Sequence, residues 1–514
     1  MRPVTRRILL LATFSLLGLA AGWPATAAGG TRAEQRTARY LESVRAEPPL
    51  LLAFLRGMPK GGDLHSHLSG AVYAENLVDW AAADGLCVDR ATARLLPGPC
   101  DPCEKESKKP AVACASGDSE LRGSMIDEWS MRNWRPERES GHDHFFSTFG
   151  KFDAALDGRG ADALAEAAAR AASDRLLYLE LMRTADGRQA AELGRRLGWD
   201  DDYARMRERL LAGGLPEIVS ATRRRLDGEE ARMQGLLGCG TARADAGCSV
   251  KVRYLYQVLR GLSREAVFAQ FLLGFELARA DSRFVGLNLV MPEDGFTSMR
   301  DFRLHMGMIA FLRPLYSEAH VALHAGELAP GLVPPEGLRF HVRESVERGH
   351  AERIGHGVDV MNEDDPLALV RLMAQRRVLV EICLTSNDVI LGVRGADHPL
   401  PVYLRHGVPV TLATDDQGVS RSDMTQEYLR GARTYGLSWP DLKGMARRSL
   451  EHAFLPGASL WRDARRFVRV AACGGDRPPL AAVPPTCEAF LRGSERARLQ
   501  WELEEQLAAF EKRW

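Results

Sequence analysis

Two histidines stand one residue apart in "GGDLHSHL" (61–68), a stretch with the length and composition of a short strand. Successive side chains of a strand point to opposite faces, so His65 and His67 project from the same face. Two imidazoles on one face suit a metal ion, although a His-x-His pair also occurs without one. The pair therefore needs further ligands before it indicates a metal site.

Polar residues also stand at the ends of three later strand-like stretches. These are His324 and Glu327 in "HVALHAGE", His356 in "ERIGHGV", and Asp415 and Asp416 in "PVTLATDDQ". Each has a structural alternative, because a lone histidine at a strand end is usually hydrogen-bonded and "TDD" often caps a helix. In combination, three histidines and one aspartate make the mixed ligand set that Zn²⁺ accepts with a position open for water. We expect one zinc ion per chain, bound by His65, His67, His324 and Asp415.

The remaining polar residues gain roles beside a metal. Zinc lowers the pKa of bound water from about 15.7 toward about 7, so hydroxide becomes available at neutral pH. His356 is expected to accept or orient the proton of that water, and Glu327 to act as an acid toward a ring nitrogen of the substrate. Asp416 points away from Asp415 and is expected to share a hydrogen bond with the substrate. Together these residues predict hydrolytic attack on a polarised carbon–nitrogen bond. Zinc rests on ligand type, since other divalent ions accept similar sets.

Short apolar or alternating stretches recur along the chain, with amphipathic Ala/Leu/Arg-rich stretches between them. The eight strand candidates span residues 61–68, 175–182, 250–259, 284–291, 320–327, 352–358, 378–387 and 409–417. Eight strands that alternate with helices favour an α/β fold of the closed (β/α)8 TIM-type barrel kind over an open sheet. In such a barrel the active site forms at the C-terminal ends of the strands, where the polar residues above stand.

The chain divides into four predicted parts. They are a signal peptide (1–27), an N-terminal helical arm (28–60), the barrel (61–456) and a C-terminal helical extension (457–514). The stretch from about 87 to 141 is rich in Cys, Pro, Lys, Glu and Ser and reads as an insertion after the first strand. The final helix is amphipathic, so it either covers its own domain or supports a homodimer contact.

The first residues indicate export. Arginines at positions 2, 6 and 7 precede an apolar run, and small residues at Ala25 and Ala27 follow it, which is typical of a secretory signal cut after Ala27. "TRRILL" also loosely resembles a twin-arginine signal, and the export route stays open. No later stretch reaches the roughly 18 to 20 apolar residues of a membrane span. We expect a periplasmic or secreted protein with no membrane association after cleavage.

Cysteine usage fits an oxidising compartment. Eight of the nine cysteines fall in three local groups: Cys87, Cys100, Cys103 and Cys114, then Cys239 and Cys248, then Cys473 and Cys487. We expect disulfides within these groups, whose connectivity the sequence does not give. A zinc site in the first group is the alternative. Cys383 lies in an apolar strand and is expected to be a buried free thiol.

The overall composition excludes some functions. The 514 residues are 45% hydrophobic, with 68 basic and 68 acidic side chains, and no basic run is interleaved with aromatics. This balance gives no indication of a nucleic-acid surface. No Gly-rich phosphate loop follows the first strand, which argues against dinucleotide binding.

Five motifs carry a family resemblance. "MPKGGDLHSHLSG", "HAGE", "RIGHG", "EICLTSN" and "LATDDQGVSRSD" resemble, in this order and spacing, the adenosine deaminase family of the metal-dependent hydrolases, over about residues 58–455. The stretch "MPKGG" before the histidine pair, the predicted signal peptide and the Cys-bearing insertion look most like the secreted adenosine deaminase growth-factor branch and its bacterial periplasmic relatives. The fourth strand ends in "VMPED", without the bridging lysine of two-metal relatives, which favours one metal.

The resemblance implies specific roles. His65, His67, His324 and Asp415 would bind zinc, and Glu327 would protonate the purine N1 as hydroxide attacks C6. His356 would steer the water and stabilise the developing charge, and Asp416 would hydrogen-bond the purine N7. Ammonia leaves, and adenosine becomes inosine.

Two departures from the family pattern concern the substrate. Ser69 stands where many members have an aspartate near the sugar hydroxyl, and Met291 with Pro292 stands where a glycine usually meets the purine N3. Proline has no backbone N–H to donate. Adenosine or 2′-deoxyadenosine is the leading substrate, with adenine, AMP or another 6-aminopurine as alternatives. For AMP, Arg183 and Arg253 are the candidate phosphate contacts. A secreted, non-catalytic binding protein and an amidase on the same barrel are the rival readings.

Overall fold

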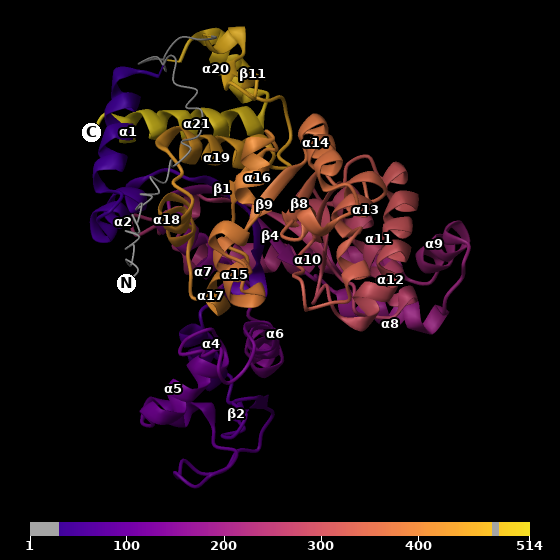
Figure 1. The fold of residues 1–514 in the computed structure, drawn as a ribbon. Coiled ribbons are helices and arrows are strands. Elements are labelled where there is room, and N and C mark those ends of the chain that lie inside the picture. The colour runs from indigo at the N-terminus through magenta and orange to yellow at the C-terminus, as the bar shows by residue number, and fades with distance from the viewer. Residues whose placement is uncertain (1–29, 475–482) are drawn as a thin grey trace, which may run out of the picture.

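The computed structural model describes residues 30–474 and 483–514. Its centre is a sheet of eight parallel strands whose spatial order follows the chain (Figure 1). These are β1 (Gly61–His67), β4 (Leu176–Arg183), β5 (Lys251–Leu259), β6 (Phe284–Val290), β7 (His320–Ala325), β8 (Arg353–His356), β9 (Leu379–Ile382) and β10 (Val410–Leu412). The N–H of Asp415 donates to the carbonyl of His65 at 2.8 Å, which joins the last strand to the first. The predicted (β/α)8 barrel is confirmed.

All eight predicted strands are present, and the last ones are shorter than expected. The predicted strand 378–387 ends at Ile382, because α15 (Leu384–Leu391) begins two residues later. The predicted strand 409–417 ends at Leu412, and α17 (Gln417–Ser420) follows. The residues with chemical roles therefore lie in the turns between strand and helix, at the C-terminal end of the barrel.

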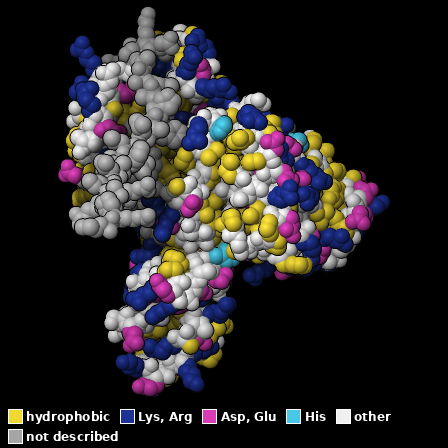
Figure 2. Space-filling model, in the orientation of Figure 1, with side chains coloured by type: hydrophobic (Ala, Val, Ile, Leu, Met, Phe, Trp, Pro, Cys, Tyr) yellow, Lys and Arg dark blue, Asp and Glu magenta, His cyan; other side chains and the backbone are white. Residues whose placement is uncertain are grey.

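Helices cover the outside of the barrel. They are α7 (Gly160–Ser173), α8 (Gly187–Leu197), α9 (Tyr203–Ala212), α10 (Leu215–Leu236), α11 (Arg264–Ala280), α12 (Phe296–Leu312), α13 (His341–Glu347), α14 (Pro366–Arg376), α16 (Leu400–Arg405), α18 (Met424–Thr434) and α19 (Trp439–Glu451). Helix α11 packs on β5 and β6 and is covered in turn by α8, so it is buried along most of its length. Basic and acidic side chains are interspersed on the face of the molecule seen in Figure 2, in line with the balanced composition.

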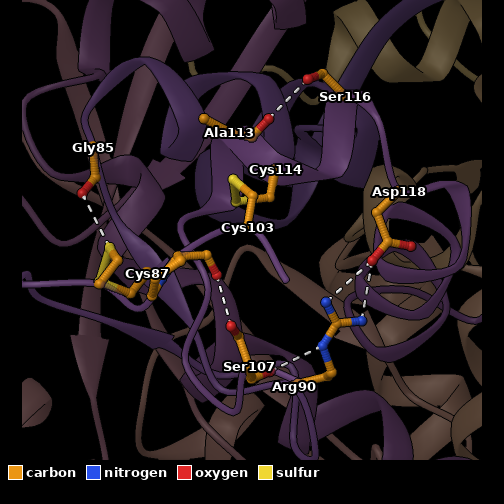
Figure 3. The surroundings of a disulfide bond; sticks show 11 residues. Gly85, Cys87, Arg90, Cys103, Ser107, Ala113, Cys114, Ser116 and Asp118 are labelled. Carbon is orange, nitrogen blue, oxygen red and sulfur yellow. Dashed lines mark hydrogen bonds and ion pairs between the residues drawn. A yellow bond between two sulfur atoms is a disulfide. The ribbon is translucent and has the colours of Figure 1, made fainter. Parts of the chain in front are cut away.

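The residues after β1 form an arm that projects from the barrel (Figure 1). It contains α3 (Leu68–Ala71), α4 (Ala74–Ala83), β2 (Cys87–Val88), β3 (Leu95–Leu96), α5 (Ser119–Glu128) and α6 (Gly141–Phe152). Two disulfides, Cys87–Cys100 and Cys103–Cys114, hold its outer part. Beside them, both terminal nitrogens of Arg90 donate to Asp118 at 3.1 Å (Figure 3). The cross-links thus add to an apolar core in this segment, which includes the buried side chains of Val112, Met125 and Trp129.

The remaining cysteines also behave as predicted. Cys239 pairs with Cys248 and Cys473 with Cys487, whereas Cys383 is a buried free thiol. The alternative of a zinc site in the first cysteine group is wrong, because all four of its sulfurs are in disulfides.

The two ends of the described chain pack together on the barrel. The N-terminal helices α1 (Arg32–Val44) and α2 (Pro48–Gly57) lie beside the C-terminal helix α21 (Glu495–Glu511) (Figure 1). The ring of Tyr40 stacks on Trp514 at a centroid distance of 3.9 Å. Helix α20 (Pro485–Arg492) and the short antiparallel pair of β11 (Trp461–Asp463) and β12 (Val468–Arg469) complete the extension. Helix α21 therefore covers its own domain, and a homodimer contact stays a prediction.

The predicted signal peptide, residues 1–27, lies outside the described residues. Among the residues that the structure describes, no helix combines the length and the apolar character needed to cross a bilayer.

The cysteine pattern makes a direct prediction. Alkylation of the native protein is expected to label no thiol, because Cys383 is only 1% exposed. In denaturant without reductant, alkylation should label one thiol per chain, and peptide mass spectrometry should assign it to Cys383. Labelling of any of the other eight cysteines in oxidised protein would contradict the four disulfides.

Candidate active site

Four side chains from the ends of three strands converge at the C-terminal end of the barrel. His65 and His67 come from β1, His324 from β7, and Asp415 follows β10. Their nearest ligand atoms all lie within 4.8 Å of one another. The Nε2 atoms of His67 and His324 are 3.2 Å apart, and the Oδ1 of Asp415 lies 3.2 Å from His67 Nε2 and 3.5 Å from His65 Nε2. The structure therefore brings together all four predicted metal ligands.

The donor atoms fit a zinc ion. Four ligands at the usual Zn–N and Zn–O distances of about 2.0 to 2.2 Å lie about 3.4 Å apart when they are tetrahedral. Three of the six separations among these atoms, at 3.2, 3.2 and 3.5 Å, match that edge length. In addition, the Nε2 of His65 is buried and has no hydrogen-bond partner in the structure. A buried lone pair without a partner is costly, and a cation among these atoms would satisfy it.

Each ligand is oriented by a polar partner on its outer side. Nδ1 of His65 contacts Glu381 at 2.7 Å, Nδ1 of His67 contacts Gln257 at 2.9 Å, Nδ1 of His324 contacts Asn288 at 2.8 Å, and Ser386 donates to Asp415 at 2.6 Å. Because each imidazole donates Nδ1–H outward, its Nε2 lone pair points inward. The sequence analysis missed these partners. Their one signal is that Glu381, Asn288 and Gln257 are polar residues inside otherwise apolar strands.

Glu381 belongs to a buried ion network inside the barrel. Its second oxygen accepts from Nε of Arg353 at 2.6 Å, and a terminal nitrogen of Arg353 donates to Glu180 at 2.6 Å. All three side chains are fully buried. A buried charge is retained only when its partners are in place, so the network fixes the position of Glu381 and, through it, of His65.

Glu327 is a buried carboxyl group beside the ligands. Burial is the main cause that raises its pKa well above the ordinary value, and the negative charges of Asp415 and Glu293 add to the effect. Its Oε1 lies 3.6 Å from Nε2 of His356. A carboxyl group that stays protonated at neutral pH is suited to donate a proton, which is the role predicted from the sequence.

His356 is held in one tautomer. The side-chain amide of Asn387 donates to its Nδ1 at 3.0 Å, while the amide oxygen of Asn387 contacts Nε2 of His398 at 3.1 Å. Burial lowers the pKa of His356 to about 3, so the ring is neutral and carries its hydrogen on Nε2. The geometry therefore favours His356 as a group that orients water by donating a hydrogen bond over one that accepts its proton.

Asp416 is buried next to the metal ligands, and its Oδ1 has no partner. Burial raises its pKa to about 7. Gly70 makes room for it, since a Cβ at that position would lie 1.6 Å from Oδ1. An unpartnered carboxyl oxygen in this place can share a hydrogen bond with a ligand, as the sequence analysis expects.

Glu293 orders the backbone at the proposed acid. It is 1% exposed, and its two oxygens accept from the backbone N–H groups of Gly326 at 3.1 Å and Glu327 at 2.8 Å. Nδ1 of His341 contacts the same carboxylate at 2.5 Å. Within the "VMPED" turn Glu293 is therefore a buried structural anchor. Its function in holding Glu327 was not predicted.

Ser69 and Met291 lie at different places around the site. Ser69 lines a cavity of about 480 Å³, together with Gln257, the hydrogen-bond partner of ligand His67. Met291 lies at the rim, 39% exposed, with a left-handed φ of 83°. The guanidinium of Arg260 donates to its carbonyl at 3.0 Å and to that of His324 at 3.3 Å. Substrate contacts by Ser69 and Met291 stay predictions.

The fold is a parallel α/β barrel, and three histidines and one aspartate at its C-terminal end could hold a metal ion. Residues 219–460 match the family model described as "Adenosine deaminase". Two curated relatives carry the same name. The one from Mycobacterium ulcerans is 28% identical over 235 residues, 44% of this chain and 60% of that protein. The one from Salmonella heidelberg is 41% identical over 137 residues, 26% of this chain and 38% of that protein.

Over the matched residues the chain is therefore similar to the adenosine deaminase family. It matches 38% to 60% of the length of these relatives. Among solved structures, the adenine deaminase from Arthrobacter aurescens resembles it with a TM-score of 0.48 and 17% identity, over 77% of this chain and 94% of that one.

The contact between Glu381 and His65 leads to a prediction for metal binding. Glu381→Gln is expected to lower the zinc affinity about 10- to 100-fold, because the amide is a poorer acceptor for Nδ1–H of His65 and a poorer partner for Arg353. Competition against a chromophoric chelator measures the affinity. The matched control is Glu352→Gln. Glu352 directly precedes β8, at the end of the barrel away from the ligands, so its loss should leave the zinc affinity unchanged. Equal affinities in the two variants would contradict the role of Glu381.

The carboxylate of Glu293 leads to a second prediction. Glu293→Gln places an amide NH₂ group against backbone N–H donors, so the segment that carries Glu327 is expected to shift. Loss of a hydrogen-bond acceptor costs roughly 1 to 3 kcal/mol, and we therefore expect kcat to fall about 10- to 100-fold. Zinc content should stay the same. Asp174→Asn is the control, because Asp174 is also buried and accepts from the backbone N–H groups of Met424 and Thr425, before β4 at the end of the barrel opposite the site. An unchanged kcat in Glu293→Gln would remove the assigned role.

Proposed function

We propose that the protein is a zinc-dependent hydrolase that deaminates adenosine and 2′-deoxyadenosine to inosine and 2′-deoxyinosine, with release of ammonia. One observation carries the proposal. A carboxyl group whose pKa is raised, Glu327, stands beside three histidines and an aspartate whose ligand atoms meet at one point. The similarity to adenosine deaminases supports the same class of reaction, which is hydrolytic deamination.

Zinc is the proposed cofactor, with one ion per chain held by His65, His67, His324 and Asp415. When bound, it supplies Lewis-acid activation of a water molecule at neutral pH. Cys383 lies in a second group of ligand atoms with His65, His356 and Asp415. Burial raises the pKa of this thiol well above its ordinary value, which disfavours the thiolate that zinc prefers.

The protein side chains divide the remaining work. Glu327 holds a proton on its carboxyl group and delivers it to N1 of the purine, which makes C6 more electrophilic. The Nε2–H of His356 points toward Glu327 and orients the attacking water. Asp416, with a pKa of about 7 and a free Oδ1, shares a hydrogen bond with N7 of the purine. Water adds at C6, and the amino group leaves as ammonia.

The charges around the adjoining cavity support a nucleoside over a nucleotide. This cavity of about 480 Å³ is lined by Arg159, Arg183 and Arg225, together with Asp153, Asp157 and Glu229. Arg183 pairs with Glu229 at 2.7 Å, and Arg225 pairs with Asp186 at 3.0 Å. Arg159 donates to Asp84 at 3.0 Å.

Every arginine of this cavity is therefore already neutralised by a carboxylate. The other candidate phosphate contact, Arg253, pairs with Glu495 at 2.9 Å. A phosphate dianion would meet no free cation among the described lining residues, whereas sugar hydroxyl groups would find both donors and acceptors. We assign the contact with the sugar to Ser69, which lines this cavity, and the contact with the purine edge to Met291.

The proposed location is the periplasm or the exterior of the cell. Four disulfides support an oxidising compartment. The proposed signal peptide at residues 1–27 accounts for the export. Placement in the secreted branch of the family rests on the same features.

A substrate assay tests the proposed function. The zinc-loaded protein is expected to lower the ultraviolet absorbance of adenosine and to release ammonia, whereas Glu327→Gln should bind zinc and lose about 10²- to 10⁴-fold in kcat. Glu336→Gln, an exposed carboxylate nine residues further on, is the control that should keep full activity. Removal of the metal should abolish turnover, and added zinc should restore it.

A panel of adenine, AMP and 2′-deoxyadenosine separates the alternatives. Faster turnover of AMP than of adenosine would contradict the argument from the paired arginines. Zinc binding with no turnover of any 6-aminopurine would point to a binding protein and refute the proposed reaction.

A further inference from the structure

Two adjoining cavities lie at the N-terminal end of the barrel, opposite the candidate active site. The first, of about 430 Å³, lies between the starts of β7, β8 and β9 and the ends of α13 and α14. The second, of about 490 Å³, lies between the end of α14, the loop after α16 and the turn after β11. Arg377 lines both cavities and therefore stands between them.

The walls of the two cavities carry unpaired positive charge. Within the described part of the chain, six of their arginines have no carboxylate oxygen within 4.0 Å: Arg371, Arg376, Arg377, Arg448, Arg465 and Arg496. The second cavity has no acidic residue in its described lining. The first has Glu352 and Glu451, and neither carboxylate lies within 4.0 Å of the six arginines. Glu352 contacts His320 at 2.9 Å, and Glu451 accepts from Ser459 at 2.6 Å and Gln500 at 2.9 Å.

Backbone carbonyls orient several of these arginines without neutralising them. Arg376 donates to the carbonyl of Val346 at 3.1 Å, and Arg496 donates to that of Leu455 at 2.8 Å. Each such contact uses one or two of the five N–H donors of a guanidinium, so the others remain free for a ligand. The guanidinium groups are thus held in place with donors left over.

His452 provides a second observation at the same place. It lines the first cavity, and its Nε2 is buried without a hydrogen-bond partner. Burial lowers the pKa of His452 to about 3, and the charge of Arg377 adds to the effect. A polar atom that is left unsatisfied at the wall of a cavity marks a position where a ligand oxygen or hydroxyl would be stabilised.

We propose that the two cavities form one binding site for a small polyanion that carries at least two phosphoryl or sulfuryl groups. One group occupies each cavity, and Arg377 contacts both. Guanidinium groups recognise the oxygens of such anions by paired hydrogen bonds, which explains why arginine rather than lysine lines the walls. The site lies at the other end of the barrel from the metal ligands, so its occupation is independent of the proposed deaminase function.

Calorimetric titration of the full zinc-loaded chain with inorganic triphosphate tests the site. We expect one triphosphate per chain, bound more weakly as the salt concentration rises. Arg377→Gln should weaken binding at least 10-fold. Arg465→Gln should also weaken triphosphate binding. Because Arg465 is an exposed residue of the second cavity, this variant tests the site even if Arg377→Gln folds poorly. Arg224→Gln, an exposed arginine of α10 away from both cavities, should bind like the wild type. Activity on adenosine should be the same in all three variants.

Separate titrations with inorganic phosphate and with sulfate distinguish the chemistry. Weak binding of both single anions, with much tighter binding of triphosphate, would support the two-group site. Equal affinity for triphosphate in wild type, Arg377→Gln and Arg465→Gln would overturn the proposal. So would competitive inhibition of deamination by triphosphate that is equal in wild type and variants, because the anion would then bind at the metal.

Discussion

The buried guanidinium of Arg353 is the interaction on which the metal site depends. It lies inside the barrel between Glu180 of β4 and Glu381 of β9, at 2.6 Å from each. Transfer of three charges from water to the interior costs several kcal/mol per ion, so the arrangement is stable only when all partners are present. Since Glu381 also contacts His65, the ion network ties three strands of the barrel to the first of the four candidate metal ligands. The ion pairs that hold these strands together therefore also fix the position of the His65 imidazole.

A second pair of buried charges does the same for the proposed acid. Arg260 is fully buried, as is Glu293, which receives the backbone N–H groups of Gly326 and Glu327. The negative charge of Glu293 also raises the pKa of Glu327, whereas the positive charge of Arg260 opposes that rise. The group that positions the acid thus helps to keep it protonated. A change at Glu293 would therefore alter both the position of Glu327 and the pKa of its carboxyl group.

The residues that bear the chemistry were accessible from the sequence, and the residues that support them were not. His65, His67 and His324 stand in short motifs at strand ends, where the position of the strand already predicts a common location. The partners of these ligands come from neighbouring strands, and only the register of the folded sheet brings them together. Glu293 shows most clearly what the sequence does not reveal. Nothing about an acidic residue that follows a proline in a turn indicates burial, yet Glu293 is buried in the folded protein.

The balanced net charge conceals a separation of charge between the two ends of the barrel. Because all strands run in the same direction, the returning helices direct their N-termini to the catalytic end and their C-termini to the other. Each helix C-terminus carries roughly half a negative charge, which accounts for a basic residue such as Arg376 in the last turn of α14. Two or three helix ends, together with the carboxylates of Glu352 and Glu451, balance only part of the charge of six arginines around the adjoining cavities. The surplus positive charge needs a counter-ion of its own, and the cavities provide the space for one.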